Sequence, residues 1–396
     1  MDGAYLAEWA NLLLRWLHVI AAMAWIGTSF YFMALDQSLR PPRDGDPLVR
    51  GEQWAVHGGG FYLKRKFWAG PGFLPEKLHW SKWEAYWTWI SGFALFVLIY
   101  YGQASTYLID PDVMDLSPWQ AIGLSLGLIL LAWVVYDLIC RSPIGQDGVA
   151  MAVAGVAGLA LAAWIATSLF SGRGAYLQVG AMIGTLMAAN VLMVIIPGQK
   201  KMVAAIAAGR EVDPRWGAFG KQRSVHNNYM TLPVVFLMLS PHYPMFWQHE
   251  RAWLLLVAMA LAGALVRQFF NLRHRGITAY DFWVLGATVV VLVAVFIAPP
   301  RRAETTAAAP AVTFAEVQQI MQARCVECNM PRPTNPAFAS PPKGVLLHTP
   351  AQIRRQAASW AQQVRTEAMP PNNSTGLTEE ERAKLLAWVA AGAKLD

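Results

Sequence analysis

The chain has 396 residues, of which 55% are apolar and only 14% are charged. Soluble globular domains carry about 25% charged residues, so this composition excludes an ordinary water-soluble fold of the same length and indicates contact with lipid. The net charge of +7 is divided almost evenly between residues 1–300 and the remainder. No segment is basic enough to predict nucleic-acid binding.

Up to residue 300, apolar runs long enough to cross about 30 Å of hydrocarbon alternate with short polar segments. The first run contains Arg15 and is preceded by acidic residues, which favours a retained helix over a cleaved signal peptide. Prolines interrupt the sixth run, but spanning helices that have neighbours tolerate proline. Eight spanning helices are predicted: 11–35, 84–101, 119–140, 149–170, 175–197, 229–247, 252–270 and 280–298.

Lys and Arg predict the orientation of these helices, because loops rich in them stay in the cytoplasm. When successive loops alternate between the two sides, one side receives 18 Lys and Arg residues and the other receives only Arg173 and Arg251. Both ends of the eight-helix body are therefore expected outside the cytoplasm. The chain is predicted to be a multi-pass protein of a bacterial inner membrane, with its N-terminus and its C-terminal segment in the periplasm.

Residues 299–312 have the Pro, Ala and Thr content of a linker, and residues 313–396 are expected to form a small helical domain. Such a small domain needs an additional stabilising element, and a pair of cysteines is the candidate. Three helices are predicted in it: 314–324 after Thr313, a pattern over 350–366, and a last helix that opens with the capping box Thr378-x-x-Glu381.

Cys325 and Cys328 form a C-x-x-C motif, which is typical of a redox disulfide, half of a zinc site, or covalent haem attachment. Zinc needs two more ligands, and the tail offers only His348. A thioredoxin-like motif would follow a strand, which the pattern does not predict. Haem attachment fits best, because Met369 follows 41 residues after Cys328 and carries a thioether that can ligate iron. The third cysteine, Cys140, is most simply a small buried residue.

With this pattern the tail resembles a small class I cytochrome c over nearly all of residues 313–396. That family's motif is C-x-x-C-H, whose histidine is the proximal iron ligand, whereas here Asn329 follows Cys328. An amide is a poor ligand for haem iron. Two interpretations stay open: a haem c held by the two cysteines with Met369 as axial ligand, or a haem-free domain with a Cys325–Cys328 disulfide.

The stretches Leu14–Gly27, Gly58–Lys66, Leu78–Trp89 and Arg223–Pro233 resemble the membrane-bound urate oxidase (urate hydroxylase) family. The resemblance implies an all-α chain, in which a polytopic bundle over residues 1–298 is joined to a C-terminal cytochrome c. It also implies oxidation of urate to 5-hydroxyisourate in purine breakdown, with electrons passing through the cytochrome to an acceptor of the respiratory chain.

Two histidines of the body are candidates for a haem b. His18 shares a helix face with Arg15, and both His18 and His242 are expected about 8–10 Å below the outer surface. Two imidazoles at one depth are what a non-covalent haem requires. The alternative is that His18 is hydrogen-bonded inside the bundle.

Polar residues of the cytoplasmic loops are candidates for urate binding. Urate is a planar anion, so its site needs cationic or amide donors and an aromatic face. His57, His226 and Asn227 are predicted to be catalytic, with His226 or His57 as the base. The basic run Lys64–Lys66 and His79 are further candidates. A basic run beside a membrane is also typical of a segment that sets topology or contacts lipid. For His226 and Asn227, the alternative role is to cap the start of a helix.

Two other functions stay open at this level. The first is a haem-carrying electron-transfer protein of the membrane that does not oxidise urate. The second is a non-redox transporter or binding protein, which follows if Asn329 leaves the tail without haem.

Overall fold

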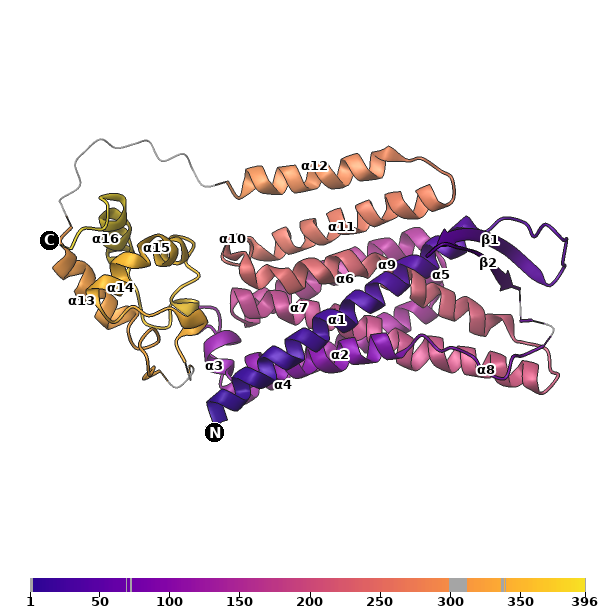
Figure 1. The fold of residues 1–396 in the computed structure, drawn as a ribbon, viewed down its shortest axis with the longest axis horizontal. Coiled ribbons are helices and arrows are strands. Elements are labelled where there is room, and N and C mark those ends of the chain that lie inside the picture. The colour runs from indigo at the N-terminus through magenta and orange to yellow at the C-terminus, as the bar shows by residue number, and fades with distance from the viewer. Residues whose placement is uncertain are drawn as a thin grey trace.

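The computed structural model describes residues 3–68, 70–71, 73–298, 312–335, 338 and 340–395. The part up to residue 298 is a bundle of long helices, and the part from residue 312 is a small helical domain at one end of it (Figure 1). The long helices of the bundle are α1 (Gly3–Ser38), α2 (Trp83–Phe96), α4 (Pro118–Arg141), α6 (Gly148–Leu169), α7 (Gly172–Ala189), α8 (Ile196–Ala207), α9 (Pro214–Leu239), α11 (Ala252–His274) and α12 (Tyr280–Phe296).

Short elements complete the bundle. The π-helical segment η1 (Val97–Tyr101) extends α2. A second one, η2 (Asn190–Ile195), joins α7 to α8, so that residues 172–207 form one continuous helical run. The remaining elements are α3 (Ala104–Tyr107), α5 (Pro143–Gln146), η3 (Ser240–His242) and α10 (Pro244–Trp247).

Helices form in all eight predicted spans, and the all-α membrane bundle is confirmed. Five of the described helical runs are long and apolar enough to cross a membrane, and α12 is a shorter apolar helix. The bounds predicted for the sixth span, 229–247, are wrong. Its helix, α9, already begins at Pro214 and ends at Leu239, because prolines 241 and 244 divide the following segment into short turns.

The middle of the bundle is packed around α7. In the most apolar stretch of the run 172–207, 50% of the residues are buried, whereas only 11% are buried in the corresponding stretch of α1. Small residues allow close approach of the helices: Gly180 of α7 faces Leu237, and Gly263 of α11 faces Leu232 and Pro233 of α9. The fully buried side chains of this core include Leu108, Phe170, Tyr176, Leu237 and Leu256.

A β-hairpin after α1 was not predicted. Strands β1 (Val49–His57) and β2 (Gly60–Phe67) pair antiparallel. The two residues between them, Gly58 and Gly59, have φ of +58° and +81°, the left-handed conformation that a tight two-residue hairpin requires. Lys66 of β2 and Lys221 of α9 both form ion pairs with Asp36, so the hairpin is tied to α1 and α9.

The loops gather at the two ends of the bundle as their alternation predicted. The hairpin, α5 and the turn between α8 and α9 lie at one end, whereas α3, α10 and the C-terminal domain lie at the other (Figure 1). Two of the 18 Lys and Arg residues counted for the cytoplasmic side are buried in helices: Arg223 lies in α9 and Arg267 in α11, with 1% and 5% of their surface exposed.

The C-terminal domain contains the three predicted helical regions. Thr313 and Thr378 form capping boxes with Glu316 and Glu381, and the helix predicted over 350–366 is broken in two at Gln356. Trp360 and Trp388 stack in its core with ring centroids 6.3 Å apart. Its elements are α13 (Phe314–Arg324), η4 (Pro342–Gly344), α14 (Pro350–Arg355), α15 (Ala357–Arg365), η5 (Pro371–Asn373) and α16 (Glu379–Ala390). Apart from residue 312, the predicted linker lies outside the described residues.

The close contact between α1 and α2 gives a prediction. A methyl group added at Gly92 of α2 would stand 2.6 Å from Cε1 of His18 on α1. We expect Gly92→Ala to lower the free energy of unfolding by about 1–3 kcal/mol, because the His18 ring must shift from its hydrogen bond to Thr88 or the two helices must separate. Thermal unfolding in detergent measures the change. Gly123→Ala on α4 is the control, since nothing lies within 4 Å of its added methyl group; equal stability of the two variants would contradict the packing.

Candidate functional site

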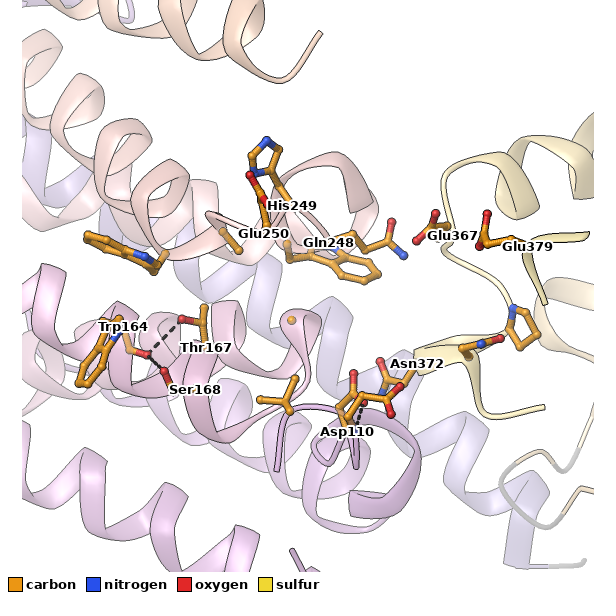
Figure 2. A pocket seen from close by; sticks show the side chains of 18 of the residues that line it. Asp110, Trp164, Thr167, Ser168, Gln248, His249, Glu250, Glu367, Asn372 and Glu379 are labelled. Carbon is orange, nitrogen blue, oxygen red and sulfur yellow. Dashed lines mark hydrogen bonds between the residues drawn. The ribbon is translucent and has the colours of Figure 1, made fainter. Parts of the chain in front are cut away.

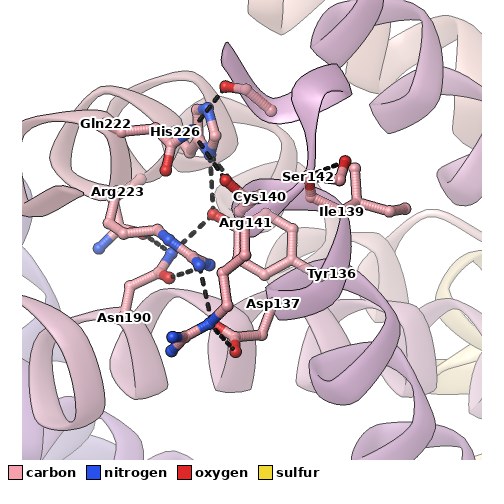
Figure 3. A network of polar contacts seen from close by, with 12 residues as sticks. Tyr136, Asp137, Ile139, Cys140, Arg141, Ser142, Asn190, Gln222, Arg223 and His226 are labelled. Atoms are coloured by element: carbon pink, nitrogen blue, oxygen red, sulfur yellow. Dashed lines mark hydrogen bonds and ion pairs between the residues drawn. The ribbon is translucent and has the colours of Figure 1, made fainter.

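A buried ion pair lies between α4 and α9 at the end of the bundle away from the C-terminal domain (Figure 3). Nη2 of Arg223 stands 2.7 Å from Oδ1 of Asp137, and the other oxygen of Asp137 accepts from Nε of Arg141 at 2.7 Å. Nη1 of Arg223 donates to Oδ1 of Asn190, and its guanidinium lies over the ring of Tyr136 at 5.0 Å. Arg223 is therefore neutralised and held on several sides.

Asn190 connects this ion pair to the neighbouring polar groups. It is the first residue of the π-helical segment η2, where the wider turn shifts side chains relative to a regular helix. Its Nδ2 donates to the hydroxyl of Tyr136 at 3.0 Å and to Oδ1 of Asn227 at 2.8 Å. Asn227 in turn donates to the backbone oxygen of Met187. The network thus joins α4, the α7–η2 run and α9.

His226 is the end of this network. Its Nδ1 lies 2.9 Å from the hydroxyl oxygen of Tyr136 and 3.7 Å from Sγ of Cys140. Because Tyr136 already accepts from Asn190, we assign its hydroxyl hydrogen to Nδ1 of His226, which places the proton of a neutral imidazole on Nε2. Tyr136 and His226 are therefore arranged as a proton donor and acceptor pair. Cys140 was predicted to be a small buried residue; it is buried, and it also contacts His226.

A pocket of about 140 Å³ adjoins the network, between the end of α4, the η2–α8 junction and the start of α9. We call it the inner pocket. It shares Arg141 and Arg223 with the network, and Lys201 adds a third cation. Trp216 and Phe219 provide aromatic surface. Arg141 and Arg223 share the single carboxylate of Asp137, so with Lys201 the pocket keeps a net positive charge beside two aromatic side chains. These are the groups that a planar anion needs. The other lining residues are Met193, Val194, Pro197 and Gly198.

The structure places the candidates of the hairpin elsewhere. His57 lies at the exposed end of β1, whereas His226 is inside the bundle. The two histidines that were predicted to be catalytic therefore lie in different surroundings. The basic run of β2 anchors the hairpin: Arg65 forms ion pairs with Asp44 and Glu52, and Lys64 lies 4.6 Å from the ring centroid of Tyr31. His79 lies in an exposed loop.

The two histidines considered for a haem b lie in different surroundings. Nδ1 of His18 is 2.9 Å from the backbone oxygen of Thr88 on α2, which is the hydrogen-bonded role given above as the alternative. This bond leaves Nε2 for any other partner. His242 was expected within a spanning helix, but it lies in the turn η3 with an exposed side chain. Arg15 is exposed and donates to Asn11 on its own helix.

In the C-terminal domain, the C-x-x-C motif follows α13 as predicted, and both cysteines are free thiols. Burial raises the pKa of Cys325 to about 12 and that of Cys328 to about 11. Both groups are therefore protonated at neutral pH and are weak nucleophiles.

Asn329 has a structural role at the position where a haem c motif has its histidine. Its Nδ2 donates to the backbone oxygen of Val345 at 3.0 Å, and its backbone oxygen accepts from Leu347 at 2.7 Å. Haem iron takes His, Met, Cys or Tyr as protein ligands, and not an amide. The residues at this motif therefore do not fit an ordinary haem c. Met369 is half-buried after α15, and Nδ1 of His348 is buried without a hydrogen-bond partner among the described residues.

A second, larger cleft of about 580 Å³ separates the C-terminal domain from the bundle (Figure 2). Nδ2 of Asn372 donates across it to the backbone oxygens of Thr106 and Ile109, at 3.0 and 3.2 Å. The charged residues that line the cleft are Arg382 and five carboxylates, so the cleft does not favour an anion. The carboxylates are Asp110, Asp112, Glu250, Glu367 and Glu379.

Sequence reasoning missed several members of the buried network, namely Tyr136, Asp137 and Asn190. Asp137 is an acidic residue within a predicted span, and ionisable residues inside a membrane are usually functional or paired. That signal could have led to Arg223, which lies three residues before His226. Nothing local to Asn190 or Tyr136 distinguishes them from core residues.

The buried ion pair predicts strong coupling between its partners. We expect Arg223→Met to lower the free energy of unfolding by about 3–5 kcal/mol, because Asp137 keeps only Arg141. Adding Asp137→Leu should recover most of that loss in a double-mutant cycle. Arg215→Met is the control, since its side chain is 79% exposed, and it should change stability by less than about 0.5 kcal/mol. Strictly additive losses for Arg223 and Asp137 would contradict the pairing.

Position 329 gives a prediction for the C-terminal domain. Asn329→His restores the motif histidine, and we expect this variant to gain covalent haem when produced together with the cytochrome c attachment machinery. A haem stain of the denatured protein measures attachment. Asn335→His, in the same domain, is the control for an added imidazole elsewhere. The interpretation of the motif is wrong if Asn329→His carries no more haem than the unaltered chain.

Comparison with protein families places the bundle in a known family. The family described as "Urate oxidase N-terminal" matches residues 4–298, which is the whole helix bundle with the buried network and the inner pocket. Comparison with curated proteins and with solved structures gave no match.

Proposed function

Because the chain belongs to the Urate oxidase N-terminal family, we propose that it oxidises urate to 5-hydroxyisourate within a membrane. In this reaction urate and one water give 5-hydroxyisourate, two protons and two electrons. The chain must therefore bind a planar anion, accept protons and deliver electrons to an acceptor.

The inner pocket is the observation that supports the proposal. The urate monoanion presents carbonyl oxygens to Arg141, Lys201 and Arg223, and its flat ring system stacks on Trp216 or Phe219. Charge-assisted hydrogen bonds to carbonyl and ring atoms bind and orient it. The larger cleft beside the C-terminal domain, which we call the outer cleft, has five carboxylates and one arginine as its charged lining and repels the same anion.

The proton steps fall to the pair behind Arg223. A proton released by the substrate or by the attacking water passes to the oxygen of Tyr136, while the hydroxyl hydrogen of Tyr136 moves to Nδ1 of His226. Asn190 holds the tyrosine oxygen in place through its 3.0 Å bond. His226 is thus the base of the proposed reaction, and Asn227 positions Asn190.

Electrons leave to a separate acceptor. The parts of α4, α8 and α9 that line the inner pocket lie at the opposite end of the bundle from the C-terminal domain (Figure 1). The motif around Asn329 does not fit an ordinary haem c. The proposed acceptor is a carrier of the respiratory chain that takes the two electrons in one or two steps.

The test is anaerobic turnover of the purified full-length protein with ferricyanide, a one-electron acceptor. We expect two ferricyanides to be reduced for each urate consumed. His226→Gln should lower kcat by about 10²-fold or more, as removal of a general base does. His249→Gln, which lines the outer cleft, is the matched control and should keep full activity. Absence of urate-dependent reduction in the unaltered protein, or equal activity of both variants, would overturn the proposal.

A further inference from the structure

A second buried polar cluster lies where α9 and α11 pack against each other, beside α1 (Figure 1). Nε of Arg267 donates to Oδ1 of Asn228 at 2.9 Å, and Nδ2 of Asn271 donates to the same oxygen at 3.0 Å. All three side chains are more than nine-tenths buried. Two donors on one oxygen fix the orientation of the Asn228 amide, because the reversed amide would place its NH₂ group against them.

The charge of Arg267 is not neutralised by a carboxylate among the residues that the structure describes. Its guanidinium lies over the ring of Phe30 on α1, with 3.9 Å between Cζ and the ring centroid. This contact stabilises the cation only in part, because the free energy lost when an ion is buried is larger than the free energy gained from a cation–π contact. Arg223, by contrast, has Asp137 as its counter-ion.

Three atoms of the cluster are buried and have no hydrogen-bond partner among the described residues. Two of them are donors, Nη2 of Arg267 and Nδ2 of Asn228, and the third is an acceptor, Oδ1 of Asn271. They belong to groups that meet at the Asn228 oxygen, so one small ligand can reach them together. Buried polar atoms without partners are rare in native proteins, where a bound water, ion or ligand commonly satisfies them.

We propose that Asn228, Arg267 and Asn271 bind a planar monoanion that also carries a hydrogen-bond donor, the class that includes bicarbonate and the urate monoanion. The anion neutralises Arg267 and accepts from Arg267 and Asn228. Its own O–H or N–H donates to Oδ1 of Asn271. Nitrate, which is planar but has no donor, leaves Asn271 without a partner, and water brings no charge. This site uses none of the residues of the inner pocket and does not depend on the proposed function.

The test compares thermal unfolding of the purified full-length protein in bicarbonate and in nitrate at equal ionic strength. We expect bicarbonate to raise Tm by about 2–4 °C more than nitrate, with a rise that saturates as a single site requires. Arg267→Met should abolish the rise, and Asn271→Leu should make the two anions equal. Arg273→Met, an exposed arginine on the same helix, should keep the rise and controls for loss of a charge.

Adding urate at low concentration distinguishes the two sources of the anion. A rise in Tm that Arg267→Met abolishes assigns the site to urate. If urate raises Tm equally in both proteins, it binds elsewhere and bicarbonate is the ligand of this site. The proposal is overturned if neither anion gives a rise that depends on Arg267, which is the result expected for a cluster that holds only water. Either result leaves the ferricyanide assay unaffected, so the two proposals fail independently.

Discussion

The buried ion pair between Arg223 and Asp137 is the constraint on which the helix bundle depends. Two opposite charges inside an apolar bundle are tolerated only when their geometry and hydrogen bonds are nearly complete. Here Asn190 accepts from Arg223, and Arg141 donates to the second oxygen of Asp137, which leaves only Nε of Arg223 without a partner among the described atoms of the pair. Arg223 of α9 thus bonds to Asp137 of α4 and to Asn190 of the α7–η2 run, so the relative rotation of these three elements is fixed by polar contacts as well as by packing.

Helix α9 distributes its polar side chains among three neighbours. Successive residues of a helix point about 100° apart, and the three residues His226, Asn227 and Asn228 accordingly face different elements. His226 contacts α4, Asn227 contacts the α7–η2 run, and Asn228 contacts α11. This division separates a network that contains its own counter-ion from a cluster to which the described residues supply none.

Hydropathy and local motifs predicted much of the fold. Apolar runs located the helices of the bundle, the pattern after Thr313 located α13, and the capping box Thr378-x-x-Glu381 located the first turn of α16. The start of α9 was missed because Arg223, His226 and the two asparagines make its first half polar, and only their buried partners on other helices explain a polar helix there. The hairpin was missed although Gly58 and Gly59 are typical of a tight turn, because its flanking strands lack a clear alternation of apolar and polar residues.

The candidate site was predicted only in part, for the same reason. His226 and Asn227 were identified from a local cluster, and they do lie in the buried network. Tyr136 and Asn190 are 90 and 36 residues away from His226 along the chain, and their role follows from tertiary contacts alone. His57 and the basic run of β2 were selected by composition, and the structure shows that their environment is the hairpin surface. At position 329 the sequence already shows that an asparagine replaces the histidine of a haem c motif. The structure adds that this asparagine donates to the backbone oxygen of Val345.

The source of the added oxygen tests the central claim most directly. The proposed reaction takes this oxygen from water and sends the electrons to a carrier. Anaerobic turnover of urate in ¹⁸O-labelled water, with ferricyanide as acceptor, should give 5-hydroxyisourate that contains one labelled oxygen, as measured by rapid mass spectrometry. Product that forms only when molecular oxygen is admitted, or product without the label when it is trapped before exchange, would contradict the claim.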